Sequence, residues 1–243
     1  MRCRQNLNYT MEKTYFDRLD DARQYAKKKM TDEHPWFLKI RGYINAYFTQ
    51  TTDSLQGITV ADTNLQYQLL LLISFMRTHY VVYELIFLCS NVEAATLARK
   101  QIELLSRIKE LKHRNADELK KKVPNVRCLE YLKREYGLLS EIAHSSSCDS
   151  LDFLGYNMDD DIHKRFYAQP TYTADTEELM FLWSELFIEF ILSSISIKET
   201  IVPQYNIMWD MEFLCRFLSF GKENNVRYAR SIDVEQFRSM IRQ

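Results

Sequence analysis

The sequence predicts an all-α protein, an antiparallel helical bundle built around three or four long helices. Glycine and proline are scarce, at 5 and 4 of 243 residues, whereas chains of strands joined by tight turns need more of both. Apolar residues also recur at spacings of three and four over long stretches, which is the helical period. A chain of this length can bury a sizeable core, so we expect a single helical domain over residues 1–243.

The expected domain has three parts. Residues 1–62 form N-terminal helices and a loop, 63–200 form the core of the bundle, and 201–243 form a C-terminal helical extension. The expected helices cover residues 10–30, 36–48, 63–89, 90–111, 125–144, 175–202, 208–220 and 233–241. Residues 49–62 are expected to form a surface loop, and 148–172 an irregular segment with one short helix, since neither has a helical period.

Local signals mark where several helices begin and end. Three starts carry the side-chain pair of a capping box: Thr63 with Gln66, Ser90 with Glu93, and Asp175 with Glu178. The pair Ser90 and Glu93 implies a sharp turn over residues 89–91. Gly221 is predicted to end the helix over 208–220, because glycine is common immediately after a helix. The helix that starts at Thr63 is apolar nearly all round, so we expect it at the centre of the bundle.

Charge and cysteine content limit the expected binding partners and the expected cellular location. A net charge of −1 gives no general attraction to nucleic acid or lipid. The five cysteines form no CxxC pair, which favours a reducing, cytoplasmic location. The apolar run over 65–89 contains Arg77 and Glu84, so we interpret it as a core helix and expect no membrane association. The first ten residues lack the apolar core of a signal peptide, and either Met1 or Met11 can be the translation start.

Two helices carry candidate site residues. Arg99, Glu103 and Arg107 fall on one arc of the helix over 90–111, because each is four residues from the next. They form either an ion ladder in water or part of a site. Ser140 and His144 lie one turn apart at the border of the apolar stripe of the next helix. Such a histidine can act as an acid or base near neutral pH, or can cap the last carbonyls of its helix.

The stretches LARKQIELLSRIKEL and YGLLSEIAHSSS carry these residues. Together they resemble the HEPN-like helical families of bacteria and phage-defence loci, in their uncharacterised and abortive-infection branches, over about residues 65–147. The resemblance implies that an Arg-x3-Glu and a Ser-x3-His meet in one polar cluster, at Arg99, Glu103, Ser140, His144 and Ser146. Many proteins of these families are metal-independent ribonucleases, and others bind nucleotides or partner proteins. The resemblance also implies a homodimer, because two such sites commonly face each other.

One division of labour fits an endoribonuclease of a defence or toxin system. His144 moves the proton of the 2′-hydroxyl, and Arg99 stabilises charge that develops on the phosphate. Glu103 holds Arg99, and Ser140 orients the imidazole or the substrate. The alternative is a non-catalytic helical scaffold or regulatory module that binds protein or nucleotide, in which Arg99 and Glu103 form a structural pair.

Three further predictions concern an alternative catalytic pair, a basic cluster, and bound cofactors or metals. The usual ribonuclease signature of the family, an arginine and a histidine with four to six residues between them, is met by Arg107 and His113, which form an alternative pair. The basic cluster Lys120, Lys121 and Lys122 can contact RNA phosphates or form a solvated helix end. No glycine-rich phosphate loop, HExxH, GxSxG or zinc-type cysteine spacing is present in the sequence, so we expect neither a cofactor nor a metal.

Overall fold

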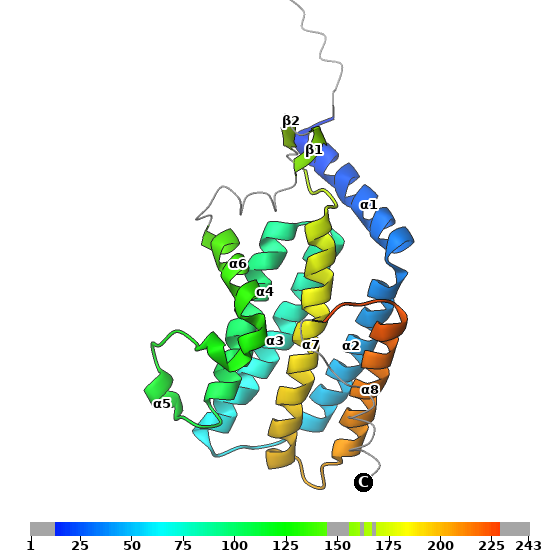
Figure 1. The fold of residues 1–243 in the computed structure, drawn as a ribbon. Helices are drawn as coiled ribbons and strands as arrows, with labels where there is room; N and C mark the ends of the chain where they lie inside the picture. Colours follow the sequence, from blue (N-terminus) through cyan, green and yellow to red (C-terminus); the bar gives the residue numbers. More distant parts are fainter. Residues whose placement is uncertain (1–12, 145–155, 161–162, 167–168, 229–243) are drawn as a thin grey trace, which may run out of the picture.

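The structure is a computed structural model that describes residues 13–144, 156–160, 163–166 and 169–228 (Figure 1). The helices are α1 (Tyr15–Glu33), α2 (Pro35–Leu55), α3 (Thr63–Phe87), α4 (Asn91–Glu110), α5 (Ala116–Leu119), the 3-10 helix η1 (Val126–Leu132), α6 (Lys133–His144), α7 (Ala174–Ile201) and α8 (Ile207–Glu223). A small antiparallel hairpin joins β1 (Tyr156–Asp160) to β2 (His163–Phe166), within the segment predicted to be irregular. The long helices form one bundle, which confirms the predicted all-α class.

The second helix is longer than predicted. It begins at Pro35, which lacks a backbone N–H and suits the first position of a helix. It continues to Leu55, so the loop predicted over 49–62 is wrong in its first half. Thr49 and Thr52 donate their hydroxyls to carbonyls four residues earlier, at 3.0 and 2.8 Å. Because the helix itself satisfies these hydroxyls, the polar run stays helical.

The cap of α3 lies one residue earlier than predicted. Asp62, not Thr63, is the N-cap, and its Oδ1 accepts the backbone N–H of Leu65 at 2.8 Å. The side-chain amide of Gln66 donates to the carbonyl of Val60 at 2.7 Å, and does not complete a capping box. A carboxylate caps a helix start as well as a hydroxyl does, so the boundary moves without a change in the fold.

The centre of the bundle is α7, and the prediction that α3 lies there is wrong. In the most apolar 18-residue stretch of each helix, 83% of the residues are buried in α7 and 39% in α3. The outward face of α3 carries exposed apolar side chains, namely Tyr67, Leu70, Ile73, Tyr80 and Val81. The mean hydropathies of the two stretches, 1.6 and 1.4, barely differ, and both helices are long and apolar enough to cross a membrane by length and composition. Hydropathy alone therefore could not separate them.

The sharp turn predicted between α3 and α4 is confirmed. Cys89 has a left-handed backbone (φ 54), and the N–H of Ser90 donates to the carbonyl of Leu85 at 2.8 Å. The side chain of Ser90 makes no cap bond, so the capping box predicted there does not form. At the start of α7 a capping box joins Thr173 and Thr176 instead of the acidic pair that was predicted. The positions of these helix starts were thus predicted better than the side chains that cap them.

The segment before His144 bends where a single helix was predicted over 125–144. It divides into η1 and α6, and Leu129 inside η1 has non-helical angles (φ −124, ψ 58). The Asn125 side chain caps the first part by accepting the N–H of Arg127 at 3.2 Å. Leu129 is fully buried, so the bend keeps its side chain in the core.

A buried ion pair fastens α8 to α7. Nζ of Lys198 lies 3.1 Å from Oδ1 of Asp210, and both side chains are 0% exposed. The same Nζ donates to Gln50 of α2 at 3.2 Å and lies 4.7 Å from the ring centroid of Tyr47, while the Tyr205 hydroxyl donates to Asp210. Burial lowers the pKa of Lys198. A buried charge without its partner is strongly unfavourable. This network therefore fixes the register in which α8 packs on α7.

The last helix passes through the glycine that was predicted to end it. α8 continues to Glu223, and the left-handed residue beyond it is Asn225 (φ 56). A Cβ on Gly221 would run into the ring and hydroxyl of Tyr228. Gly221 therefore leaves room for the Tyr228 side chain and does not mark the end of the helix. The predicted helix over 233–241 lies outside the described residues.

Candidate functional site

Packing of α4 against α6, which run in opposite directions (Figure 1), brings three polar side chains together. Nη2 of Arg99 lies 3.1 Å from Oε1 of Glu103, one turn along α4. From α6, the hydroxyl of Tyr136 donates to the same oxygen of Glu103 at 2.9 Å, and accepts from Nη2 of Arg99 at 3.5 Å. We call Arg99, Glu103 and Tyr136 the Arg99 cluster.

The Arg99 cluster is half-buried, with 22% of the Arg99 side chain and 26% of the Glu103 side chain exposed. The guanidinium of Arg99 lies 5.5 Å from the ring centroid of Tyr136, which adds a cation–π contact. Both of its polar bonds use Nη2, and Nε is buried without a hydrogen-bond partner among the described residues. The arginine is thus held in one orientation, and an anion from solvent could reach only its Nη atoms, because Nε is buried.

Ser140 and His144 continue the line of Tyr136 along α6, at steps of four residues. Eight residues of α-helix rise by about 12 Å, so His144 lies two turns beyond Tyr136, toward the N-terminal end of α4. Ser140 is partly buried and His144 is exposed. Within the described part of the chain, neither forms a hydrogen bond or ion pair with Arg99 or Glu103. The predicted four-residue site is therefore a strip along α4 and α6 and not a compact cluster.

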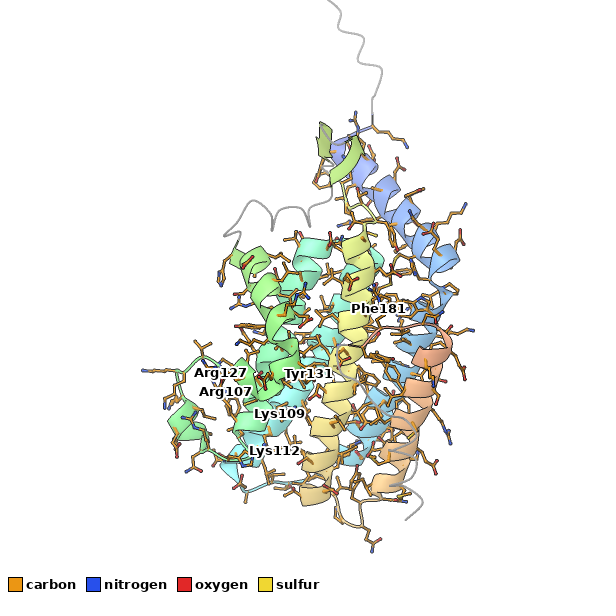
Figure 2. All side chains as sticks on the ribbon, viewed as in Figure 1. Arg107, Lys109, Lys112, Arg127, Tyr131 and Phe181 are labelled. Carbon is orange, nitrogen blue, oxygen red and sulfur yellow. The ribbon has the colours of Figure 1, made fainter. Side chains whose placement is uncertain are left out.

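The alternative pair is separated by the structure. Nη1 of Arg107 lies 2.9 Å from Glu110, with both side chains about 5% exposed, and Nη2 donates to the carbonyl of Lys122. The N–H of Asn125 donates to the same glutamate at 3.2 Å. Arg107 is therefore buried at the lower end of α4 (Figure 2), where it holds the following loop, while His113 is exposed in the turn after α4. Arg107 therefore lies on the same arc of α4 as Arg99 but has different contact partners.

The predicted RNA-binding lysines lie on a different segment from the residues of the Arg99 cluster. Lys120, Lys121 and Lys122 are exposed in the loop after α5, which projects from the left side of the bundle in Figure 1. α6 ends with His144 toward the upper end of the bundle. The Lys122 carbonyl accepts from Arg107, two turns along α4 from Arg99. Ser146, the other predicted RNA contact, lies outside the described residues.

Sequence reasoning missed Tyr136 as a site residue, because its place in the apolar stripe assigned it to the core. The signal was present in the spacing. Tyr136 precedes Ser140 by the same four residues that separate Ser140 from His144, so all three share one helix face. A tyrosine in such a line has an apolar ring for packing and a hydroxyl for bonding.

Comparison of the chain with protein-family models, with curated proteins and with solved structures found no match in any of the three. Within the described parts of the chain, no three histidine, cysteine, aspartate or glutamate side chains are grouped to hold a metal ion. Fold and site together define a class: an antiparallel all-α bundle with a half-buried Arg–Glu–Tyr cluster between two packed helices.

Proposed function

We propose that the protein is a HEPN-like, metal-independent endoribonuclease of a defence or toxin system, and that RNA binds along the α4–α6 strip. One observation carries the proposal. Glu103 and Tyr136 hold the guanidinium of Arg99 on the side of the bundle where Ser140 and His144 follow at helical spacing. Because α6 runs against α4, Ser140 and His144 lie on the Arg99 side of Tyr136.

The chemistry assigns one role to each side chain. His144 takes the proton of a ribose 2′-hydroxyl, and the resulting oxygen attacks the adjacent phosphorus. A 2′,3′-cyclic phosphate forms, and the bond to the 5′-oxygen breaks as that oxygen receives the proton from His144. Arg99 stabilises the charge on the phosphate. Glu103 and Tyr136 are positioning residues that fix Arg99, and Ser140 orients the imidazole.

A second candidate function is a non-catalytic module that binds protein or nucleotide. The observation that favours it is the engagement of Arg99 with both Glu103 and Tyr136, since such a network can simply fasten α4 to α6. A homodimer is expected under both functions, and sedimentation of the purified chain tests that expectation.

The deciding experiment is cleavage of total RNA by the purified protein in EDTA. We expect wild-type protein to produce fragments with 5′-hydroxyl ends, and His144→Ala to produce none. His144 is exposed at the end of α6, so this change should leave the fold intact. His113→Ala is the matched control, because His113 is also an exposed histidine after a helix and belongs to the alternative pair.

Each outcome assigns a function. Loss of cleavage only in His144→Ala supports the strip, and loss only in His113→Ala supports the alternative pair. Intact RNA with every protein contradicts the ribonuclease proposal and favours the binding module. Equal cleavage by all three places the activity elsewhere.

A further inference from the structure

The face of α3 that points away from the bundle carries a line of side chains at alternating steps of three and four residues. Residues at these steps lie along one side of a helix, and this is the spacing by which two helices pack along a seam. The line covers about 20 Å of helix. We call it the α3 stripe, and its members are Leu70, Ile73, Arg77, Tyr80, Val81 and Glu84.

Most of the α3 stripe is apolar and exposed. The exposed fraction is 63% for Leu70 and 55% for Tyr80, and Ile73 and Val81 are also exposed. Single apolar residues scattered over a surface are ordinary, but a continuous line of them marks a surface that another molecule covers. No described helix packs over this side of α3, so the covering molecule is not an element of the same copy among the described residues.

Two charges of opposite sign lie within the α3 stripe. Arg77 is exposed and forms no hydrogen bond or ion pair with any residue that the structure describes. Glu84 follows two turns later, and its Oε1 lies 3.6 Å from Arg41 of α2. Its other carboxylate oxygen has no partner in the described part of the chain. One line therefore presents both a cation and an anion with unused bonding capacity.

A second copy of α3 that runs antiparallel satisfies both charges. A two-fold axis that passes between Tyr80 and Val81 brings Arg77 of each copy opposite Glu84 of the other, because the two residues are equally distant from the axis along the sequence. The same axis places Ile73 level with Leu88, which is half-buried just after α3. A parallel pair would instead set Arg77 against its own copy, and like charges oppose association.

We propose that the α3 stripe is a homodimer interface, in which two copies of α3 pack antiparallel and Arg77 of each copy pairs with Glu84 of the other. The proposal gives the expected homodimer a specific surface. That surface differs from the α4–α6 strip, because all six residues belong to α3. The inference therefore does not depend on the proposed ribonuclease function.

Sedimentation velocity of the full chain over a range of concentrations tests the interface. Wild-type protein should dimerise reversibly. Arg77→Glu and Glu84→Arg each set like charges opposite one another at two places, so each alone should raise the Kd of the dimer by at least about tenfold. An equimolar mixture of the two variants should form a dimer with one copy of each, because every facing pair then joins opposite charges.

The matched control is Arg216→Glu, which makes the same change of charge at an exposed arginine of α8 and should sediment as wild type does. Melting curves show whether each variant is folded, and Arg77 is exposed, so its replacement should leave the fold intact.

Three results would overturn the proposal. A wild type that is monomeric at every concentration would leave the α3 stripe to a different protein. A dimer of Arg77→Glu as tight as that of the wild type would place the contact on another face. A mixture of folded Arg77→Glu and Glu84→Arg that stays monomeric would exclude the antiparallel pairing.

Discussion

The hydroxyl of Tyr136 on α6 donates a hydrogen bond to Oε1 of Glu103 on α4 at 2.9 Å, and so ties the two helices through the residue that pairs with Arg99. Tyr136→Phe keeps the ring beneath the guanidinium but removes this bond. We expect the free energy of unfolding to fall by about 1 kcal/mol. Under the proposed function we also expect slower RNA cleavage with little change in KM, because Arg99 loses its alignment.

The matched control for that change is Tyr67→Phe, since Tyr67 is an exposed tyrosine of α3. Urea denaturation and single-turnover cleavage should both be unchanged in the control. If Tyr136→Phe loses stability and cleaves RNA at the wild-type rate, Tyr136 is structural only.

Acid should destabilise the protein through His79. Burial lowers the pKa of this residue to about 3, while the unfolded chain has its ordinary value near 6.5. Below that value the unfolded state binds a proton that the folded state does not bind, so stability present at pH 7 is lost as the pH falls toward 3. At pH 5 the loss from this group is about 2 kcal/mol.

Urea denaturation at pH 7.5 and pH 5 checks this prediction, with His79→Gln in parallel. Glutamine does not titrate, so the variant should lose less stability between the two pH values than the wild type. An equal loss in both proteins would assign the acid sensitivity to other groups.

Breaking the Lys198–Asp210 pair should be among the most damaging single changes. Asp210→Ala leaves the ammonium of Lys198 buried and uncompensated, which we expect to cost about 3–5 kcal/mol. The double change Lys198→Met with Asp210→Leu should recover part of that loss, because no charge remains in the core. Denaturant titration of the three proteins measures both values. A double variant less stable than Asp210→Ala would contradict this account.

Gly221→Ala should destabilise the protein only while Tyr228 is present. A methyl group at this position meets the ring and hydroxyl of Tyr228, so we expect the tail after α8 to be displaced. In a Tyr228→Ala background the clash is gone, and the better helix propensity of alanine should make the same change neutral or stabilising. A double-mutant cycle on melting temperature shows whether Gly221→Ala is destabilising in the one background and neutral or stabilising in the other. The same effect in both backgrounds would mean that the clash plays no part.

The sequence was most informative where local chemistry decides the structure. Scarce glycine and proline predicted the all-α class, and helical periods located the long helices. The observed helix boundaries differ from the predicted ones where a polar side chain can bond either within a helix or in a loop. Thr49 and Thr52 bond to the carbonyls of their own helix, so a polar stretch read as loop remains helical.

Tertiary packing determines which helix is central and which arginine is buried, and helical periodicity could not predict either. α3 and α7 are almost equally apolar, and only their neighbours determine that α7 is central. Arg99 and Arg107 fall on one arc of an ideal wheel, yet the loop beyond α5 covers Arg107 and leaves Arg99 at the surface. The contact of Arg99 with Tyr136 joins residues 37 positions apart, which no helical period within α4 could predict.

The burial of Cys89 has a consequence for thiol chemistry. Burial raises the pKa of the Cys89 thiol to about 11, so at neutral pH only about one molecule in ten thousand carries the reactive thiolate there. Cys128 on η1 is exposed, and an alkylating reagent should modify it first once Cys3 and Cys148 are replaced by serine. A fluorophore attached at Cys128 would then lie beside the loop that Arg107 holds, and would report when that loop opens.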